Sequence, residues 1–478
     1  MTRILDLVVV GGRVIDPESG LDAVRTVGIR DGRVVDIADD AKVPPARDTV
    51  DARGLVVAPG FIELHSHGHD SVNYEFQARD GVTTTFELES GTYPIAPWYA
   101  AREGKTLINF GVSVGHIGAR RAMLDGDSSV EGASVLGHEG QFVRLSVGAD
   151  RLDTLTALLE AELRDGALGI GMGINYTPAA TRLEVWRVFQ LAAKANVPIF
   201  VHLRYAGLID SAGGVEALQE VLANANATGA SLHVAHVTST GLAETPTMLE
   251  MIDGARQRGL DVTTEAYPYS ASSTYLQSAI FDPGFEERLG ISYNDIVWPS
   301  TGERLTSETF AKYREQGGLA VIYNIPESVV DAVYREPHVI VASDGWFTKV
   351  EGKVVGHPRA AGTFSRVLGQ FVRERGVLTL PDAVRRMTLL PAQRLERVAP
   401  TMKGKGRVQV GADADLTLFD PTRVRDVATF ENPTQFSTGI VHVIVNGTFV
   451  VRDERTVDGV WPGTAVRGQV AAATAKRN

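Results

Sequence analysis

The sequence predicts an α/β protein: a (β/α)8 TIM-type barrel with a small β-sandwich domain built from both chain termini. Short apolar runs alternate with helical stretches between about residues 59 and 403, and β-branched runs separated by glycine turns fill both ends. Strands that alternate with helices favour parallel pairing, and a stretch of this length suits a closed eight-stranded barrel. The chain has 478 residues, more than the roughly 250 to 300 that a single core holds, so we expect two domains.

The barrel is expected over residues 59–403, with helical stretches such as 153–165, 183–196 and 214–228 between its strands. The candidate strands are the runs at residues 60–64, 82–88, 106–114, 166–172, 198–201, 231–235, 261–266 and 338–342. Residues 268–337 show no obvious second strand-helix unit, so most of them are predicted to form a long insert that covers the barrel mouth as a lid. The alternative is a passive surface insert or an oligomer contact. An open doubly wound sheet stays possible, since it also alternates strands with helices.

The chain ends, residues 1–58 and 404–478, are expected to form one discontinuous β-sandwich domain. Both ends carry short β-branched runs closed by turn residues, for example at residues 7–10, 27–29, 34–37 and 439–447. Runs of this kind are typical of strands in antiparallel sheets. We therefore expect the two ends to pair with each other.

Composition narrows the class of ligand. The formal net charge is −11, which disfavours binding to nucleic acid or to an anionic membrane, so a small molecule is the expected partner. The absence of cysteine excludes disulfides and thiolate chemistry, so any transition metal must be held by histidines and carboxylates. No apolar run reaches membrane-spanning length, and the N-terminus does not resemble a signal peptide. We expect a cytoplasmic protein; the sequence leaves its oligomeric state open.

Histidines and one aspartate stand where candidate strands end. His65 and His67 follow the run 60–64, and two residues of an extended segment that are two apart point to the same side. His202, His236 and Asp344 follow later strands. A lone histidine is more often a core or surface residue, but the C-terminal ends of all strands in a parallel barrel share one mouth. Their joint placement favours a metal site.

At these residues the chain resembles the amidohydrolases, specifically the branch of N-acyl-D-amino-acid deacylases, or D-aminoacylases. The supporting segments run from end to end. They lie at residues 58–67, 81–84, 115–116, 202–204, 267–274, 343–345, 357–359 and 411–416. The first and last are typical of the wider superfamily, whereas the tyrosine-rich segment 267–274 and the His-Pro-Arg segment 357–359 are typical of the deacylase branch.

The resemblance implies a metal-dependent hydrolase that uses metal-activated water to cleave the amide bond of a small N-acyl amino acid, with a D configuration. One or two divalent ions, as Zn²⁺, would be bound. His65 and His67 would bind one metal position, and His202 and His236 the other. Asp344 would be a metal ligand and the acid and base that moves the proton, while His116 is a candidate to polarise the substrate carbonyl.

The resemblance also implies a set of substrate-binding residues. Arg359 would hold the substrate carboxylate, because a guanidinium donates two parallel hydrogen bonds to it. Tyr267 or Tyr269 would orient the substrate, and Arg204 is a further candidate from the segment 202–204. His357 is expected to support Arg359 rather than to bind metal.

Two positions depart from the deacylase pattern. Ser90 stands where the family has a metal-binding cysteine, and serine is a poor zinc ligand. Glu89 is the natural replacement and Glu87 is the second choice, since the two share a strand face. Thr238 stands where a lysine is expected, so part of the substrate contact differs. The run 166–172 has no lysine, which argues against a carboxylated lysine that bridges two metals.

Two other functions remain possible. A cyclic-amide hydrolase of the hydantoinase or dihydroorotase type shares the barrel and its ligands, but the missing lysine and the presence of Arg359 argue against it. A catalytically silent relative that binds partners through its surface is the alternative from another class. The substrate side chain, acyl group, chirality and number of metals stay open at this point.

Overall fold

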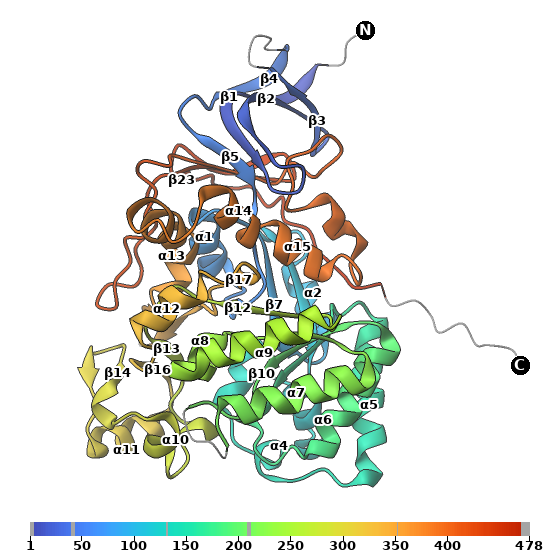
Figure 1. Ribbon diagram of the computed structural model, residues 1–478, viewed down its shortest axis with the longest axis vertical. Helices are drawn as coiled ribbons and strands as arrows, with labels where there is room; N and C mark the ends of the chain where they lie inside the picture. Colours follow the sequence, from blue (N-terminus) through green and yellow to red (C-terminus); the bar gives the residue numbers. More distant parts are fainter. Residues whose placement is uncertain (1–3, 40–43, 131, 208–211, 351, 470–478) are drawn as a thin grey trace, which may run out of the picture.

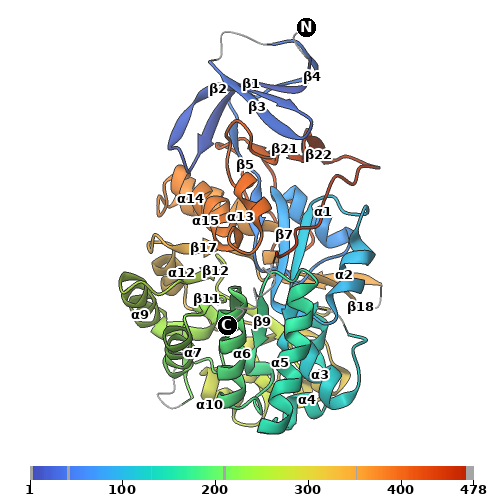
Figure 2. The same ribbon diagram turned by 90° about the vertical axis from the view of Figure 1, so that its right-hand side faces the viewer.

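The computed structural model describes residues 4–39, 44–130, 132–207, 212–350 and 352–469. Its centre is a sheet of eight parallel strands in the order β17-β12-β11-β10-β9-β8-β7-β6 (Figures 1 and 2). Each strand lies at one of the eight predicted positions, so the predicted barrel is confirmed. The strands are β6 (Phe61–Glu63), β7 (Val82–Thr92), β8 (Asn109–Gly115), β9 (Ile170–Gly173), β10 (Pro198–His202), β11 (Ser231–Val234), β12 (Val262–Ala266) and β17 (Val339–Val341).

The barrel closes where β6 and β17 meet, and this seam is joined by bonds just beyond the two strands. The backbone N–H of Asp344 donates to the carbonyl of His65 at 2.8 Å, and that of His67 donates to Gly345 at 3.1 Å. The Ser343 N–H donates to the buried Glu63 carboxylate at 2.8 Å. Three predicted site residues, His65, His67 and Asp344, therefore take part in closing the barrel.

Amphipathic helices surround the barrel. In α6 the apolar residues at helical spacing are buried, Thr181 caps the N-terminus, and Asn196 ends the helix in a left-handed conformation. None of the described helices is long and apolar enough to cross a membrane. The outer helices are α1 (Ser71–Arg79), α2 (Ile95–Arg102), α3 (His116–Asp125), α5 (Ala149–Arg164), α6 (Arg182–Ala195), α7 (Gly214–Thr228), α9 (Thr245–Gln257), α12 (Glu327–Val333), α14 (Leu380–Met387) and α15 (Leu389–Leu395).

Most of the expected insert forms a small subdomain beside the barrel, yellow in Figure 1. Its antiparallel sheet has the order β13-β16-β14-β15, and its own aromatic core includes Phe285, Trp298 and Phe310. In contrast, α12 packs on α9 as a barrel helix although it lies within the range predicted as insert. The elements are β13 (Ser272–Tyr275), α10 (Phe285–Leu289), β14 (Ile296–Trp298), β15 (Glu303–Arg304), α11 (Ser307–Gln316) and β16 (Leu319–Ile322).

Strands from both chain ends form one nine-stranded sheet at the opposite pole from the insert. The link is β5, which pairs with β1 and with β20. After β23 the chain returns to the barrel, where the Val466 N–H donates to the Phe110 carbonyl at 2.7 Å. The strands are β1 (Leu5–Asp16), β2 (Leu21–Arg30), β3 (Arg33–Ala38), β4 (Ala46–Asp51), β5 (Val56–Pro59), β20 (Leu416–Phe419), β21 (Ile440–Val445), β22 (Thr448–Arg452) and β23 (Arg455–Thr456).

Candidate metal centre

Six side chains from five strand ends converge at the C-terminal mouth of the barrel. They form three overlapping groups, and within each group the possible ligand atoms lie within 4.8 Å of one another. All six were predicted as metal ligands from the sequence, and the structure brings them together. The groups are His65, His67 and Glu89; His65, His236 and Asp344; and Glu89, His202 and His236.

The Glu89 carboxylate lies between the two histidine pairs. Its Oε1 is 2.7 Å from His202 Nδ1 and 3.0 Å from His236 Nε2. Its Oε2 is 3.3 Å from His65 Nε2 and 3.4 Å from His67 Nε2. Burial by itself raises the pKa of this carboxyl, but His65 and His202 outweigh burial and hold the pKa well below its usual range. Glu89 thus offers one carboxylate oxygen to each histidine pair, and carboxylate oxygen is a ligand type that divalent cations accept.

An irregularity in β7 carries Glu89 to this position. The ladder with β8 pairs Glu87 with Val112 and then Thr92 with Val114, so β7 holds extra residues in between. Gly91 lies in this bulge with a φ of +60°, and a Cβ there would be 2.7 Å from the backbone of Ser113 and Gly115. A bulge re-aims side chains, so strand alternation alone did not decide which acid faces the metal site.

Glu87 and Ser90, the other two candidates for the position of Glu89, lie outside the three groups of possible metal ligands. Glu87 is buried, and its carboxylate contacts His67 Nδ1 at 3.0 Å, on the side of the imidazole away from the cluster. The Ser90 hydroxyl donates to Glu89 Oε2 at 3.4 Å. Glu87 can therefore orient His67 and Ser90 can support Glu89, while Glu89 is the acid whose oxygens lie among the candidate ligand atoms.

The donor set fits a divalent metal. Burial by itself lowers the pKa of His65 and His67, but the surrounding carboxylates outweigh burial and raise both well above the usual value. The pocket thus stabilises positive charge. Imidazole nitrogens and carboxylate oxygens are the ligands that zinc accepts when no thiolate is present.

His65 is held from behind by residues that the sequence analysis missed. Glu265 on β12 contacts both His65 Nδ1 and, at 3.0 Å, His233 Nε2. His233 Nδ1 in turn contacts the Thr263 hydroxyl at 2.8 Å. A second contact of this kind fixes which imidazole nitrogen is free for a metal. The sequence does hold a sign of this role, since Thr263 and Glu265 lie on one face of a buried strand. An acid is almost never fully buried without a partner, so Glu265 needed one.

Two predicted ligands have unusual backbone conformations. The φ of His236 is +26° and that of Asp344 is +50°. Positive values are uncommon for residues other than glycine, and backbone strain of this kind is one of the features that functional sites can carry. The His236 ring is further fixed by the Ser239 hydroxyl, 3.0 Å from Nδ1.

Arg359 opens α13 (Arg359–Arg366) and lies beside the cluster. Its Nη2 is 3.0 Å from Asp344 Oδ2 and donates to the Ser273 carbonyl at 3.3 Å. The guanidinium carbon lies 4.5 Å from the centre of the Tyr267 ring. Within the described part of the chain, the buried Nε and Nη1 of Arg359 have no hydrogen-bond partner. Two donors are therefore available for an anion next to the cluster.

Arg359 also sets the charge of Asp344. Burial by itself raises the pKa of the Asp344 carboxyl, but Arg359 and His65 outweigh burial and hold the pKa well below its usual value. The carboxylate is therefore ionised near neutral pH and can accept a proton or bind a cation.

His357 and Tyr269 support Arg359 from behind. His357 Nδ1 accepts from the Arg359 backbone N–H at 3.0 Å, and Nε2 donates to the Ala271 carbonyl at 3.0 Å. The Tyr269 ring packs edge-on against His357, with 5.2 Å between ring centres, and carries the Arg366 guanidinium on its face. Tyr267, in contrast, lines the cavity beside the cluster.

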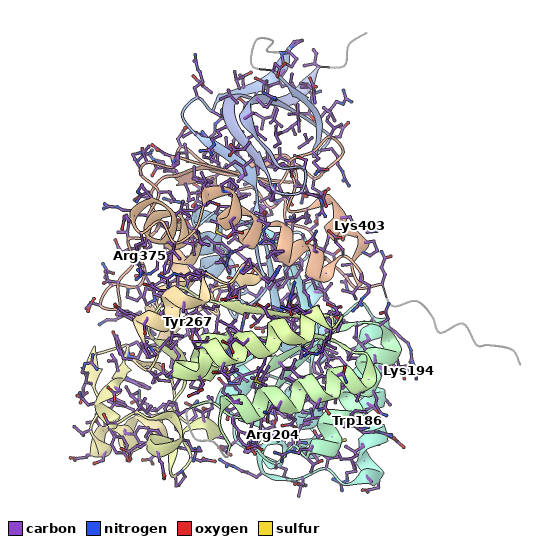
Figure 3. The ribbon with its side chains drawn as sticks, in the orientation of Figure 1. Trp186, Lys194, Arg204, Tyr267, Arg375 and Lys403 are labelled. Carbon is purple, nitrogen blue, oxygen red and sulfur yellow. The ribbon has the colours of Figure 1, made fainter. Side chains whose placement is uncertain are left out.

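Arg204 and His116 are not brought to the cluster. Arg204 makes two bonds of 2.7 Å to Glu220 on α7 and one of 2.6 Å to the Ala180 carbonyl, and Figure 3 shows it apart from Tyr267. His116 Nε2 is 2.8 Å from Glu184, which also pairs with Arg120. Neither residue is among those that line the cavity beside the cluster. Buried carboxylates on the outer helices hold both side chains there.

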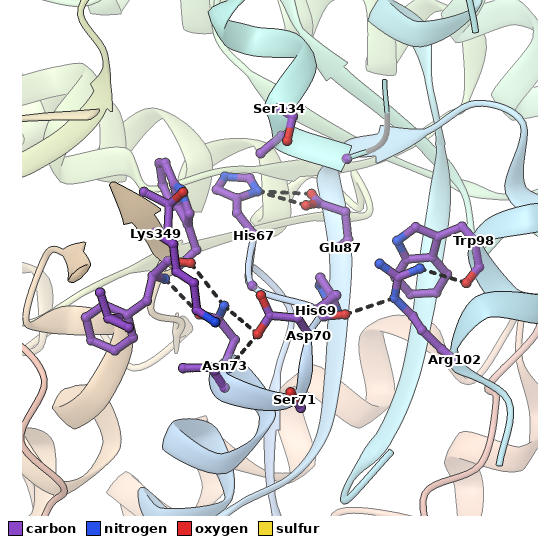
Figure 4. Close-up of a pocket in the computed structure, with 18 of the residues that line it drawn as sticks. His67, His69, Asp70, Ser71, Asn73, Glu87, Trp98, Arg102, Ser134 and Lys349 are labelled. Atoms are coloured by element: carbon purple, nitrogen blue, oxygen red, sulfur yellow. Dashed lines mark hydrogen bonds and ion pairs between the residues drawn. The ribbon is translucent and has the colours of Figure 1, made fainter. Parts of the chain in front are cut away.

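Two cavities meet at His67 and Trp346, which line both. The cavity that reaches the metal cluster is bounded by Tyr176, Tyr267 and Asp344, and residues 272–274, 280, 289, 322 and 324 add a wall from the insert. The second cavity, of about 550 Å³, lies on the other side of His67. Figure 4 shows this second cavity with Asp70, Arg102, Lys349 and the contact between His67 and Glu87. The insert thus shapes one side of the candidate site.

A barrel whose mouth gathers four histidines and two carboxylates is the arrangement of a metal-dependent hydrolase. The chain belongs to the amidohydrolase family, whose model matches residues 48–451. It is 30% identical to N-acyl-D-glutamate deacylase of Alcaligenes xylosoxydans xylosoxydans over 94% of each chain. It is also 30% identical to D-aminoacylase of the same organism, over 98% of this chain and 96% of that one.

A solved structure agrees with these relatives. N-acyl-D-glutamate deacylase of Bordetella bronchiseptica, complexed with zinc and a phosphonate that mimics the tetrahedral intermediate, superposes with a TM-score of 0.80 at 27% identity. The match covers 97% of this chain and 100% of that one. The resemblance inferred from the sequence is confirmed.

Proposed function

We propose that this protein is a zinc-dependent deacylase that hydrolyses the amide bond of small N-acyl-D-amino acids. The observation that carries the proposal is the position of Arg359, whose unpartnered Nε and Nη1 lie beside a cluster of metal ligands. The D configuration is supported by the relatives, which are named as deacylases of D-amino acids.

The side chains suit the two requirements of amide hydrolysis. A bound zinc ion supplies Lewis acidity and lowers the pKa of coordinated water from about 15.7 to about 7. His65, His67, Glu89, His202 and His236 would hold the metal. Asp344 accepts the proton of the attacking water at its carboxylate and returns it to the leaving amine nitrogen. The acyl carbon gains the water oxygen as its bond to nitrogen breaks.

Arg359 orients the substrate. A free α-carboxylate would accept a hydrogen bond from one of the two spare donors, Nε or Nη1, while Nη2 stays with Asp344. The same side chain thus binds the remote end of the substrate and holds the carboxylate that moves the proton. Tyr267 supports the guanidinium plane from its face.

This arrangement favours a deacylase over the two alternatives. A hydantoin ring lacks the free α-carboxylate that the spare donors of Arg359 suit. Dihydroorotate has such a carboxylate, but the run 166–172 holds no lysine that could bridge two metals, which argues against a dihydroorotase. A catalytically silent relative is expected to lose ligands, whereas all six candidate ligands are present and converge.

A hydrolysis screen tests the proposal. Zinc-loaded protein is assayed for amine release from N-acetyl, N-formyl and N-succinyl derivatives of D- and L-amino acids. Hydantoin and dihydroorotate are assayed in parallel for ring opening to the N-carbamoyl acid, which releases no amine. We expect turnover of one or more N-acyl-D-amino acids and of neither cyclic amide. Hydrolysis confined to the cyclic amides would favour the cyclic-amide hydrolase, and a stable zinc-free protein without turnover would favour a binding role.

The Arg359→Lys variant keeps the charge but loses the planar guanidinium, whose separate nitrogens can bind Asp344 and the substrate carboxylate at the same time. We expect kcat/KM for substrates with a free α-carboxylate to fall roughly 10- to 100-fold, as for the loss of a charge-assisted hydrogen bond. Substrate amides, in which the carboxylate is capped, should change little.

Arg204→Lys is the matched control, because Arg204 is also buried but is paired with Glu220. Its ratio of activity on free and capped substrates should equal that of the wild type. Equal losses for both kinds of substrate in Arg359→Lys would remove the assignment.

A further inference from the structure

A cavity of about 290 Å³ lies at the end of the barrel opposite the metal centre. One side of it is formed by Asp261 and His338, which directly precede β12 and β17, and by Thr263 and Ile340 within these strands. This cavity shares no lining residue with the two cavities that meet at His67. Its ligand would therefore not be the substrate of the proposed hydrolase.

Positive charge dominates the lining. Arg256 on α9, Arg394 on α15 and the following Arg397 contribute three guanidinium groups, and among the described lining residues Asp261 is the one carboxylate. Asp261 is shared, because Arg394 Nη1 lies 2.7 Å and Arg397 Nη2 lies 3.3 Å from its two oxygens. One carboxylate leaves two of the three positive charges unbalanced.

Arg394 is the buried member of the group, with 8% of its surface exposed. Among the residues that the structure describes, its Nε and Nη2 have no hydrogen-bond partner. Burial lowers the pKa of Arg394 to about 10, which still leaves it charged at neutral pH, and Asp261 offsets part of this effect. A buried guanidinium with unsatisfied donors is costly, so the fold retains it at an energetic cost that a bound anion would reduce.

We propose that this cavity is a binding site for a small multivalent oxyanion, held by Arg394, Arg397 and Arg256. The planar, forked guanidinium is the side chain best suited to the oxygens of phosphate, sulfate or a dicarboxylate. The cavity is far larger than the roughly 10 to 15 Å³ that one water needs, so it has room for such an ion.

The site has a physical route to the metal centre. Thr263 lines the cavity, and its hydroxyl contacts His233, which contacts Glu265, which holds His65. The chain of side chains crosses the barrel interior. An anion at the far end would therefore border the network that positions a candidate metal ligand.

The test titrates sulfate against the zinc-loaded protein at constant ionic strength, with chloride as the balancing ion, and measures the melting temperature. We expect a rise that saturates, because ligand binding to the folded state stabilises it as RT ln(1 + [L]/Kd). Arg397→Gln should weaken the apparent sulfate affinity by about tenfold or more. Arg397 has 44% of its side chain exposed, so this variant is expected to fold.

Arg187→Gln is the matched control, since Arg187 has 41% of its side chain exposed and also pairs with an aspartate, Asp153. It should respond to sulfate like the wild type, whereas Arg394→Gln should lose the saturable response. An unsaturated rise of equal size in all proteins reports general exclusion of sulfate from protein surfaces and overturns the proposal.

Crystals soaked in selenate, the anomalous analogue of sulfate, locate the ion directly. A peak within hydrogen-bond distance of Arg394 or Arg397 supports the site. A peak only at the metal cluster or at Arg359 overturns it. None of these measurements depends on the substrate, so failure here and failure of the proposed hydrolase function are distinguishable.

Discussion

The Asp344→Asn variant is expected to lose turnover, with kcat reduced by roughly 100- to 10,000-fold. Asparagine keeps the size of the side chain and its hydrogen bond from Arg359, but its amide cannot accept the proton of the attacking water. Asp344 lies 3.2 Å from His67 Nε2 and 3.4 Å from His65 Nε2, so it is placed to act on a molecule held by the cluster. The measurement is steady-state hydrolysis of the best N-acyl amino acid.

Zinc content separates a chemical role from a structural one in this variant. The remaining histidines and Glu89 still form the other two ligand groups, so bound zinc should stay near the wild-type amount. The variant should also keep its affinity for the substrate, because Arg359 is unchanged. Activity above a few per cent of wild type, or loss of zinc in parallel with activity, would contradict a proton-transfer role.

The Glu89→Gln variant is expected to lose zinc affinity by more than about 100-fold. Replacing a partner of a ligand typically costs 10- to 100-fold in metal affinity, and Glu89 itself contacts all four histidines of the cluster. Glutamine has the same shape but lacks the negative charge that a bridging ligand supplies. Zinc titration with a competing chelator, followed by measurement of bound zinc, reports the change.

Two neighbouring substitutions serve as controls. Glu87→Gln changes an acid of equal size that contacts only the far nitrogen of His67 within the cluster, so a smaller loss, of about 10- to 100-fold, is expected. Ser90→Ala should leave zinc affinity near the wild-type value, since Ser90 offers one weak bond to Glu89. A loss in Glu87→Gln that equals or exceeds that in Glu89→Gln would reverse the assignment of the two acids.

The predicted ligands converge where strand ends decided the position. His65, His67, His202, His236 and Asp344 each follow an apolar run, and parallel strands in a barrel bring such residues to one mouth whatever their separation along the chain. The bulge in β7 is different, because the extra residues there disturb the period of two. The sequence therefore predicted that an acid replaces the family's cysteine here, with Glu89 as first and Glu87 as second choice, but it did not decide among Glu87, Glu89 and Ser90.

A position at the end of a strand predicted whether a residue lies at the cluster better than its presence in a family motif did. Arg204 was selected because it lies two residues after His202, and His116 because it lies in a segment shared with the deacylases. Both are held by carboxylates on outer helices, Glu220 and Glu184. A shared motif shows only that residues are close in the sequence. The direction of a long side chain depends on the hydrogen-bond partners that surround it in the folded protein.

The sequence by itself determined the order of strands and helices, the barrel and the amidohydrolase family, because hydrophobic periodicity and strand-end residues are local features. Only the tertiary structure decided that Glu265 holds His65, from 200 residues away along the chain. It also decided that Arg359 has spare donors beside Asp344, and that Arg394 has them at the opposite end of the barrel. Hydrogen-bond satisfaction depends on distances between side chains, which are set when the barrel closes.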